Sequence, residues 1–551
     1  MTKEKQKLRI IPVGGLDAIG RNMTLFEYGE DIIIVDCGIM FPTDEMPGVD
    51  FLIPDFSYVV KNRHRVKAIL ITHGHEDHIG AIPFLLQEIN APIYATKIAL
   101  GLIQKRLEEK PTPQQPVYVE ISPRDVVHIE SFVVEFIRVN HSIIDGVGLA
   151  IQTPVGIVIH TGDYKIDFSP VDGEVTDLYR FADYGERGVL LLMSDSTNAE
   201  RPGYTRSESV LNPKLIEIFS SSKGRIIVAS FASNISRIQQ VLNVAQRYNK
   251  KIVVSGLTMQ KNIEIAKSLG YLSFRDDLIV SVKEAEKLPD KRIVIICTGT
   301  QGEPMSALSR MANGTHKHFA INSGDTVVIT ASIIPGNDRL VNNIINALMI
   351  LGADVYYEQD EDIHVSGHGS QEELKLMISL TKPRYFMPIH GEFKQRKAHA
   401  WIAESLNIKP SRIIMAQNGS VIEMTGKSFD VVETLKLGEI FIDGSEIGDM
   451  ESGLIKERQV MSTDGMVVVT VIVSGGRLLL RPDVVSRGFA GHRAGDVVDL
   501  IRKDVEEHCE KMLADGAKRK DIANFIKRNL RNYVFKITRR NPMIEVQVIE
   551  V

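Results

Sequence analysis

One short stretch of the chain concentrates side chains that bind metal ions. Residues 72–82 read THGHEDHIGAI, and four ligand-type residues fill six positions with the spacing H-x-H-x-D-H: His73, His75, Asp77 and His78. Imidazole nitrogens and carboxylate oxygens are ligands that suit zinc. A lone histidine is more often an ordinary surface or core residue, but four ligand types at this spacing favour a metal site.

Short apolar strands must position these residues. The stretch follows the apolar run VKAILI, and other chemically active residues also stand where apolar runs end: Asp36, His141, Asp163 and Asp195. A sheet holds the loops at its strand ends at fixed spacing. If a helix begins near His78, then His73 and His75 face one point, while Asp77 and His78 face a neighbouring point. The sequence therefore predicts one site built at several strand ends.

The organisation of the chain changes along its length. From about Arg206 strands alternate with helices, which is typical of a parallel sheet covered by helices. Near His364 the polar strand-end pattern returns with HVSGHGS and YFMPIHGEF, so this second domain is predicted to be inserted into the first. An acidic stretch after Leu437 is predicted to be a linker. The tail is predicted to form a small α+β domain.

Composition limits the classes of protein that need to be considered. A length of 551 residues suggests about three domains. The net charge of −5 gives no overall positive field for nucleic acid. The three cysteines are far apart and form no CxxC, which argues against a disulfide framework or a thiolate zinc site. No apolar leader or membrane-length apolar run is found, so we expect a cytoplasmic protein with no membrane partner.

The spacing H-x-H-x-D-H resembles the motif of the metallo-β-lactamase superfamily. Further motif residues are present in order: Asp36 in IIIVDCG, His141 in VNHSI, Asp163 in HTGDY and His390 in PIHGE. The resemblance implies two ions bridged by Asp163, with Asp36 as a supporting residue. The implied ligand sets are His73, His75 and His141 for one ion, and Asp77, His78 and His390 for the other. Without thiolates, two Zn²⁺ per subunit are expected, and Mn²⁺ or Mg²⁺ in vitro also suits such ligands.

A long insert separates Asp195 from His368, and His390 follows soon after. This arrangement resembles the β-CASP nucleases, with motif A in SDST, motif B in VSGH and motif C in PIHGE. The stretches PVGGLDAIGRNM, SDSTNAERPGYT, SFASNISRIQQ, CTGTQGEP and HVSGHGSQEEL resemble the bacterial ribonuclease J family. The implied α/β fold is a metallo-β-lactamase αββα sandwich (1–205 and 363–436) with an inserted α/β β-CASP domain (206–362). A linker (437–462) and a C-terminal α+β domain (463–551) follow.

The resemblance implies a zinc-dependent ribonuclease with 5′–3′ exonuclease and endonuclease activity, in mRNA decay and rRNA maturation. His368 would protonate the leaving 3′ oxygen, Asp195 would orient it, and Asp77 would belong to the catalytic set. The implied substrate-binding residues are Ser230, Ala232, Ser233, Asn234, His364, Val365, Ser366, Gly367 and His368. Such small polar loops suit phosphate. The alternatives are helix capping by Ser233 or Asn234 and a turn-capping role for His368.

Expected partners are single-stranded RNA with 5′-monophosphate ends and further subunits, as a homodimer, a homotetramer or a hetero-oligomer with a paralogue. Asp50 and Asp443 resemble a structural Ca²⁺ site. The basic tract of residues 518–541 suits RNA steering or a subunit interface. Three alternatives stay open: a small-molecule thioesterase or lactamase, a catalytically weak paralogue that scaffolds an RNase complex, and a DNA-processing β-CASP nuclease. The first has no use for the insert, and the second predicts gaps among the ligands.

Overall fold

The computed structural model describes residues 6–43, 45–303, 305–331, 333, 337–358, 363–444, 446–449, 453–488 and 494–551. The chain divides into two compact units. The first comprises Met1–Phe41 and Ile53–Leu437, and the second comprises Pro42–Leu52 and Gly438–Val551. The second unit therefore joins a short segment near the N-terminus to the C-terminal part of the chain.

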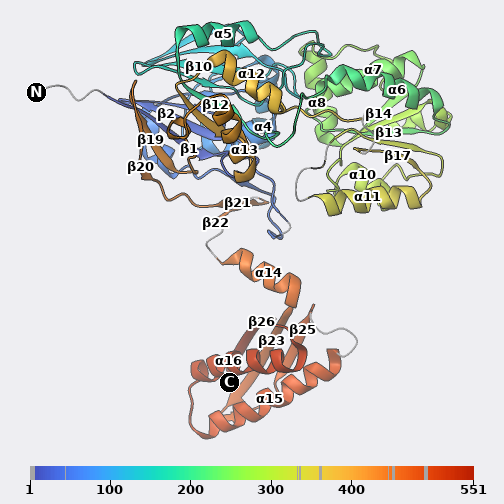
Figure 1. The fold of residues 1–551 in the computed structure, drawn as a ribbon. Coiled ribbons are helices and arrows are strands. Elements are labelled where there is room, and N and C mark those ends of the chain that lie inside the picture. Colours follow the sequence, from blue (N-terminus) through green and yellow to red (C-terminus); the bar gives the residue numbers. More distant parts are fainter. Residues whose placement is uncertain are drawn as a thin grey trace, which may run out of the picture. The chain divides into compact units, whose positions relative to one another are not determined.

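Two β-sheets pack face to face in the first unit (Figure 1). The first sheet has the strand order β20-β19-β1-β2-β3-β5-β6-β7, and the second has the order β18-β12-β11-β10-β9-β8. The strands are β1 (Leu8–Gly14), β2 (Met23–Tyr28), β3 (Asp31–Val35), β5 (Val66–Leu70), β6 (Ile93–Ala95), β7 (Tyr118–Glu120), β8 (Val126–Ile129), β9 (Phe132–Arg138), β10 (Val147–Gln152), β11 (Ile157–His160), β12 (Val189–Asp195), β18 (Tyr385–Ile389), β19 (Ser420–Met424) and β20 (Phe429–Thr434). Apolar side chains such as Phe26 and Phe136 fill the space between the sheets.

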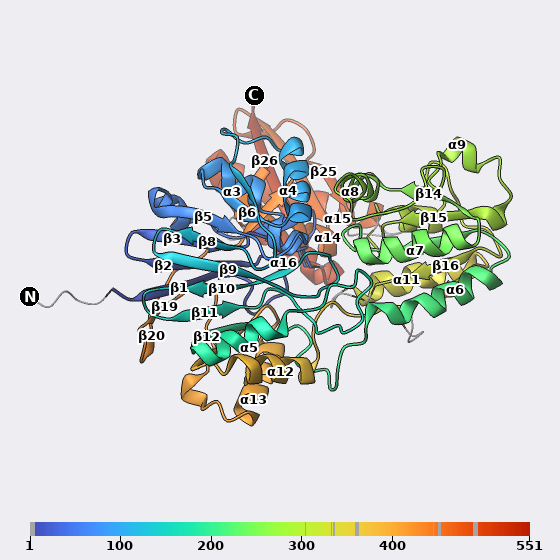
Figure 2. The same ribbon diagram turned by 90° about the horizontal axis from the view of Figure 1, so that it is seen from above.

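Helices cover the outer face of each sheet (Figure 2). The helices on the two outer faces are α1 (Ser57–Lys61), α2 (Glu76–Ile79), α3 (Ile82–Glu88), α4 (Lys97–Glu109), α5 (Leu178–Arg187), α12 (Gln371–Thr381) and α13 (Phe393–Ser405). Phe181 of α5, Leu374 of α12 and Ala400 of α13 form a second core with strand residues such as Ile159. Four layers result, helix, sheet, sheet and helix, which confirms the predicted αββα sandwich.

The inserted domain has a parallel sheet in the order β14-β15-β13-β16-β17. Its elements are α6 (Leu211–Ser221), β13 (Ile226–Ala229), α7 (Ile235–Arg247), β14 (Lys251–Ser255), α8 (Leu257–Ser268), α9 (Val282–Ala285), β15 (Ile293–Cys297), α10 (Ala307–Ala312), β16 (Thr326–Ile329), α11 (Asp338–Ile350) and β17 (Asp354–Tyr356). Helices α6 and α7 lie on one side of this sheet, and α10 and α11 lie on the other (Figure 1). Both faces are covered, which explains the largely apolar sequences of the three central strands β15, β13 and β16.

The second unit contains two small sheets. The first has the order β22-β21-β4, and the second has the order β24-β23-β25, with β26 pairing parallel to β23. Its elements are β4 (Phe51–Ile53), β21 (Ile440–Asp443), β22 (Glu446–Asp449), α14 (Leu454–Asp464), β23 (Met466–Ser474), β24 (Arg477–Leu478), β25 (Asp483–Arg487), α15 (Ala494–Ala514), α16 (Arg519–Thr538) and β26 (Met543–Glu550). Alternate residues of β23 are buried with α15 and α16, so this part has its own apolar core.

The C-terminal elements differ in detail from the sequence prediction. The segment predicted to be a linker, 437–462, contains the hairpin of β21 and β22 and most of α14. The predicted strand GRLLLRP forms only the two-residue strand β24, and Pro482 at the end of this stretch has no amide to donate to a ladder. The next residues form β25, which the sequence analysis did not predict.

Candidate active site

The predicted ligands gather because parallel strands end at one edge. β3 pairs parallel to β5, and β11, β12 and β18 are mutually parallel. Asp36 follows β3, His73 follows β5, Asp163 follows β11, Asp195 ends β12 and His390 follows β18. The carboxyl ends of parallel strands are a common place for sites in α/β proteins. Sequence-distant residues therefore meet through the pairing of their strands.

The first group of potential ligands consists of His73, His75 and His141, whose ring nitrogens lie within 4.8 Å of one another. Nδ1 of His75 lies 3.2 Å from Nε2 of His73 and 3.0 Å from Nε2 of His141. Tetrahedral coordination with bonds of about 2.0–2.1 Å places ligand atoms about 3.3 Å apart. The two distances to His75 are therefore close to the separation that a shared divalent ion requires.

Asp163 lies between this group and a second one. Its Oδ2 is 3.2 Å from Nε2 of His78 and 3.3 Å from Nε2 of His390. The same oxygen is 3.8 Å from Nε2 of His73 and 3.9 Å from Nε2 of His141. One carboxylate oxygen thus faces histidines of both groups, as a bridging ligand would.

The second group consists of Asp77, His78, Asp163 and His390. Oδ2 of Asp77 is 3.5 Å from Nε2 of His78 and 3.8 Å from Nε2 of His390. This donor set combines two carboxylates with two imidazoles, which suits a divalent ion with N/O ligands. All seven predicted ligands therefore fall into the two predicted groups.

Asp36 supports the ligands without joining either group. Nδ1 of His78 donates to Asp36 Oδ2 at 2.8 Å, and the amide of Thr72 donates to Oδ1 at 2.8 Å. The Thr72 hydroxyl donates to Oδ2 and lies 3.0 Å from Nδ1 of His73. Such contacts fix which ring nitrogen is free for a metal. Asp36 has φ of +61°, an unfavourable conformation of the kind that often accompanies functional sites.

The two groups differ in their electrostatics. Burial lowers the pKa of His73 and His141 well below the usual value, and it lowers the pKa of His75 to about 4. Burial also opposes charge on His78, but Asp163, Asp77 and Asp36 outweigh it and raise its pKa well above the usual value. The first group therefore holds neutral imidazoles, the form that binds metal, while the second is rich in negative charge.

His368 and Asp195 form a pair beside the second group. Nδ1 of His368 donates to Asp195 Oδ2 at 2.8 Å, and it lies 4.0 Å from Asp163 Oδ2. Burial disfavours charge on His368, but Asp195 and then Asp163 outweigh it and raise its pKa to about 9. The amide and hydroxyl of Thr197 hold the other oxygen of Asp195 at 2.9 and 2.8 Å. These carboxylates therefore favour the protonated form of the imidazole, which is the form that can donate a proton.

Known family models match most of the chain. The description "Metallo-beta-lactamase superfamily" matches residues 16–185, and "Ribonuclease J, beta-CASP domain" matches residues 223–348. The description "Zn-dependent metallo-hydrolase RNA specificity domain" matches residues 355–410, and "Ribonuclease J C-terminal domain" matches residues 453–551. The order of these matches agrees with a sandwich that is interrupted by an insert.

Full-length relatives decide the family. Ribonuclease J 1 of Streptococcus pyogenes is 43% identical over 98% of this chain and 97% of its own length. Ribonuclease J of Thermus thermophilus is 41% identical over 98% of this chain and 95% of its own length. Ribonuclease J2 of Bacillus subtilis is 39% identical over the whole of both chains. The chain belongs to the ribonuclease J family. It is therefore a ribonuclease of the metallo-β-lactamase and β-CASP class, as the sequence analysis predicted.

A solved structure shares the fold of this ribonuclease J family member. The crystal structure of a protein of unknown function from Enterococcus faecalis aligns with a TM-score of 0.54 at 14% identity, over 76% of this chain and all of that one. At this identity the similarity concerns the fold alone. No helix in the described part of the chain has the length and apolarity needed to span a membrane.

Two loops of this ribonuclease J family member contain the predicted substrate-binding residues. Ser230 Oγ and His364 Nε2 are buried and have no hydrogen-bond partner among the described residues. Thr330 connects the two loops. Its amide and its hydroxyl both donate to the carbonyl oxygen of Ala229, next to Ser230, at 2.9 Å, and its own carbonyl oxygen lies 3.3 Å from His364 Nδ1. These unpaired polar atoms are available to a bound group, and burying them unpaired costs about 1–3 kcal/mol each.

Other residues of these loops already have structural contacts. Asn234 caps α7, because its side chain accepts from the amide of Arg237 at 2.9 Å. The hydroxyl of Ser366 accepts from Nδ2 of Asn198 at 2.8 Å. Carbonyl oxygens of two further predicted residues accept from Asn262 and from His141: those of Ala232 and Gly367. Val365 is buried, while Ser233 is half-buried. The capping alternative therefore applies to Asn234.

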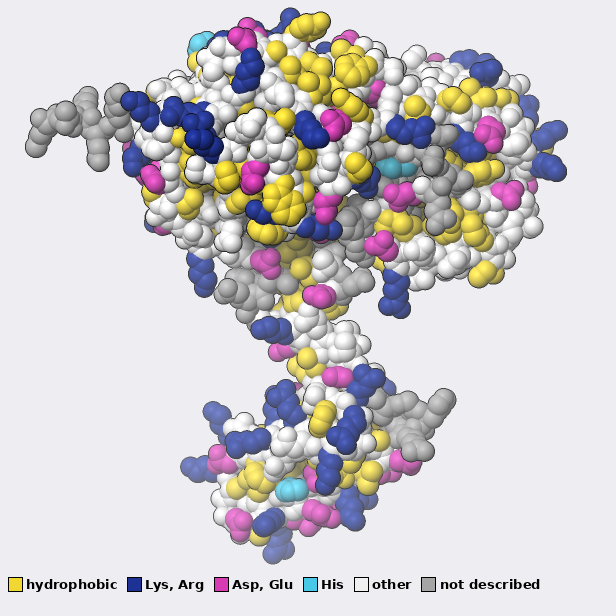
Figure 3. Space-filling view, viewed as in Figure 1, with side chains coloured by type: hydrophobic (Ala, Val, Ile, Leu, Met, Phe, Trp, Pro, Cys, Tyr) yellow, Lys and Arg dark blue, Asp and Glu magenta, His cyan; other side chains and the backbone are white. Residues whose placement is uncertain are grey.

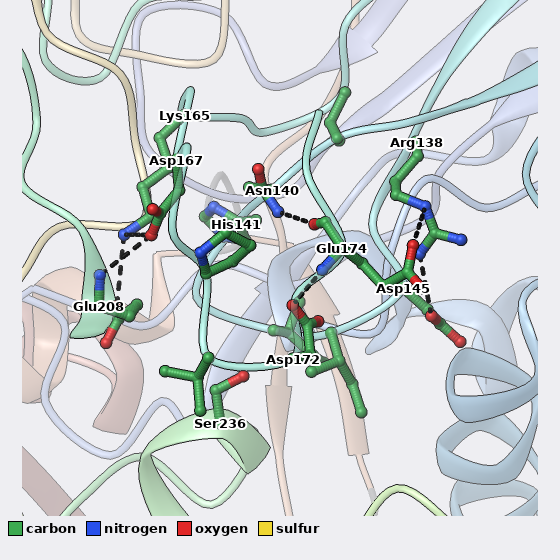
Figure 4. A pocket seen from close by; sticks show the side chains of 15 residues that line it. Arg138, Asn140, His141, Asp145, Lys165, Asp167, Asp172, Glu174, Glu208 and Ser236 are labelled. Atoms are coloured by element: carbon green, nitrogen blue, oxygen red, sulfur yellow. Dashed lines mark hydrogen bonds and ion pairs between the residues drawn. The ribbon is translucent and has the colours of Figure 1, made fainter. Parts of the chain in front are cut away.

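A polar pocket lies against His141 (Figure 4). Its labelled lining residues are Arg138, Asn140, His141, Asp145, Lys165, Asp167, Asp172, Glu174, Glu208 and Ser236. Nζ of the buried Lys165 is 3.6 Å from Glu208 Oε1 and 3.7 Å from Asp167 Oδ2. Carboxylates outnumber cations in this lining, so the pocket disfavours a phosphate group.

The remaining predicted sites lie in the second unit. Asp443 forms an ion pair with Arg458, and Asp50 Oδ2 accepts from the amide of Gly444 at 2.7 Å. In the described part of the chain, no group of three potential ligands includes either carboxylate. The Arg458 guanidinium thus pairs with a carboxylate oxygen of Asp443 that the predicted calcium ion would need as a ligand.

The basic tract lies mostly on α16. All of its lysines and arginines are exposed: Lys518, Arg519, Lys520, Lys527, Arg528, Arg531, Lys536, Arg539 and Arg540. Lysine and arginine side chains are frequent on the visible face of this domain (Figure 3). Two of them have carboxylate partners, since Lys527 lies 3.0 Å from Glu545 and Arg540 lies 3.3 Å from Asp464.

Among the residues to which the sequence assigned no role, Thr72 and Asn22 each contact residues of the ligand groups. Thr72 contacts Asp36 and His73, and Asn22 contacts His390 and Asp77. Thr72 lies within the metal-binding stretch, so its position could have suggested a supporting role. Asn22 belongs to the stretch PVGGLDAIGRNM, which has no ligand spacing of its own, and its contacts depend on the fold.

Proposed function

We propose that this ribonuclease hydrolyses RNA phosphodiesters at a two-zinc centre, by 5′–3′ exonuclease and endonuclease cleavage, in mRNA decay and rRNA maturation in the cytoplasm. The observation that supports this most is Asp163 Oδ2, which lies within 3.9 Å of histidine nitrogens from both ligand groups. Zinc is favoured because all seven ligands are nitrogen or carboxylate donors without thiolate, a set that Mn²⁺ or Mg²⁺ also suits in vitro.

The chain's own residues would prepare the reaction. One ion would be held by His73, His75 and His141. The other ion would be held by Asp77, His78 and His390, and Asp163 would contact both ions. When bound, two such ions supply an activated water and stabilise charge on the phosphoryl oxygens. His368 would donate a proton to the leaving 3′ oxygen, and Asp195 would hold His368 in the orientation and charge state that this step needs.

A substrate comparison tests this proposal against the DNA-processing alternative. Purified protein with two equivalents of zinc should degrade single-stranded RNA of defined sequence and leave the DNA of the same sequence intact. Cleavage of both at similar rates would contradict the assignment of RNA as the substrate. Absence of any cleavage, with two ions bound, would favour the scaffolding alternative.

We further propose that the loops at Ser230 and His364 bind the 5′-monophosphate of the RNA. Each offers a buried polar atom without a partner. Neither loop stretch, SFASN nor HVSGH, contains a lysine or arginine, so the extra charge of a triphosphate has no local counterion. Exonuclease cleavage should therefore favour monophosphate ends, and internal cleavage should be nearly independent of the end group.

Replacing Ser230 by alanine is expected to reduce the preference for monophosphate ends by about 10- to 100-fold, because a hydrogen bond to a charged group contributes about 1.5–3 kcal/mol. The measurement compares exonuclease rates on 5′-monophosphorylated and 5′-triphosphorylated RNA. Ser255→Ala is a matched control, since Ser255 is also a buried serine at a strand end of the same sheet but already contacts His316 at 3.0 Å. If both variants lost the preference for monophosphate ends equally, the proposed phosphate-binding role of Ser230 would be refuted.

We also propose that the C-terminal domain drives self-association into a homodimer or homotetramer, or into a hetero-oligomer with a paralogue. The sheet leaves β25 and β26 at its edges, where Val485 and Ile549 are exposed. Open strand edges with apolar side chains are suited to pairing with another subunit. A chain that ends at Met461 should sediment as a monomer in analytical ultracentrifugation. Retention of the full-length oligomer would exclude this role.

A further inference from the structure

Asn22 contacts three residues of the second ligand group from a loop at the N-terminal end of β2. Its Oδ1 accepts from Nδ1 of His390 at 2.8 Å. Its Nδ2 donates to the carbonyl oxygen of Asp77 at 3.0 Å and lies 3.0 Å from Nε2 of His78. The side chain is 9% exposed, so these contacts are shielded from water.

The amide has one orientation that satisfies both Asp77 and His390. The carbonyl oxygen of Asp77 can only accept, so Nδ2 must face it and Oδ1 must face His390. An oxygen acceptor at His390 Nδ1 requires a proton on that nitrogen. The opposite nitrogen, Nε2, then has a free lone pair directed at Asp163 and Asp77, the side on which an ion would bind.

The loop is built so that this amide fits. A Cβ at Gly15, which has φ of +84°, would lie 2.5 Å from Asn22 Oδ1, so a larger residue there would displace the amide. The carbonyl oxygen of Gly15 also accepts from the amide of His390 at 3.0 Å. His390 has φ of +48°, an unfavourable conformation that needs such external support.

We infer that Asn22 is a positioning residue that sets the tautomer and orientation of His390 and fixes the Asp77 backbone, and so tunes the affinity of the second metal site. This inference rests on the proposed two-metal function. It assigns to Asn22 the role that Asp36 has toward His78. Removing a supporting contact of this kind lowers metal affinity by about 10- to 100-fold.

The test is a zinc titration of the metal-free protein in competition with a chromophoric chelator. It compares the parent with Asn22→Ala and with Asn22→Leu, which removes the hydrogen bonds but keeps the side-chain volume. Asn418→Ala is the matched control. The Asn418 amide also makes two hydrogen bonds to this loop, to Leu16 N at 3.1 Å and Leu16 O at 2.8 Å, without touching a ligand.

Both Asn22 variants should bind the first ion with parental affinity and the second about 10- to 100-fold more weakly, and saturating zinc should restore most of the turnover. Asn418→Ala should match the parent in both binding steps. Parental affinity for both ions in the Asn22 variants would overturn the inference, as would an equal weakening of both steps. A parent that binds no zinc would instead contradict the proposed function, and the inference would fall with it.

Discussion

Replacing His368 by alanine is expected to lower the rate of RNA cleavage by about 10²-fold or more, while both metal ions stay bound. The imidazole donates to Asp195 through Nδ1 at 2.8 Å, and the surrounding carboxylates favour its protonated form. We therefore propose that His368 supplies a proton and does not coordinate a metal ion. Single-turnover cleavage kinetics and elemental analysis of the same preparation would measure both effects.

His390→Ala provides the contrast, because it removes a ligand from the second group and should lower metal content along with activity. A second signature concerns pH. Cleavage by the parent should fall as the pH rises through the pKa of the His368 imidazolium, since the acid is present below that pKa and lost above it. His368→Ala should lack this basic limb. Equal metal loss in both variants would show that His368 is a ligand.

Asp163→Ala is expected to abolish measurable cleavage and to remove the second ion together with part or all of the first. Its Oδ2 faces histidine nitrogens of both groups, at 3.2 Å from His78 and 3.8 Å from His73. Removing it deletes a shared ligand and leaves closely packed imidazoles without the negative charge between them. The measurement is zinc content per chain after dialysis, with RNA cleavage followed in parallel.

Asp195→Ala is the matched control for Asp163→Ala. Both carboxylates are buried at ends of neighbouring strands, but Asp195 hydrogen-bonds His368 and Thr197. It should keep two ions and lose turnover in the manner of His368→Ala. Asp195, His368, Asp163 and His390 also lie close enough to hold an ion themselves. Loss of one ion from the Asp195→Ala variant would therefore indicate that the second ion binds to this alternative group of residues.

The sequence was sufficient to predict the fold class and to nominate the ligands. Residues 73–78 present four ligand types in one stretch, and the partners Asp163 and His390 stand at strand ends within recognisable motifs. Residues at these strand ends lie close together in the structure because β11, β12 and β18 pair in parallel, which brings their carboxyl ends together. Both predicted ligand groups appear as separate clusters of atoms.

Contacts between distant loops could not be predicted in the same way. Asn22 and His390 are 368 positions apart, and neither the type nor the spacing of Asn22 indicates a partner. The choice between capping and binding for Asn234 depended on one local hydrogen bond, to the amide of Arg237. The Arg458 ion pair with Asp443 also joins residues that no pattern connects. Such features follow from packing, which single-sequence patterns do not encode.

Metal content and cleavage, followed on one preparation, show whether a two-zinc centre hydrolyses RNA. Zinc per chain is determined in the purified protein, and cleavage of 5′-monophosphorylated RNA is followed before chelation, after chelation and after stepwise return of zinc. We expect about two zinc ions per chain, loss of cleavage after chelation, and full recovery only when the second equivalent has been added. Full activity in protein that has been stripped of all transition metal would contradict a two-zinc mechanism.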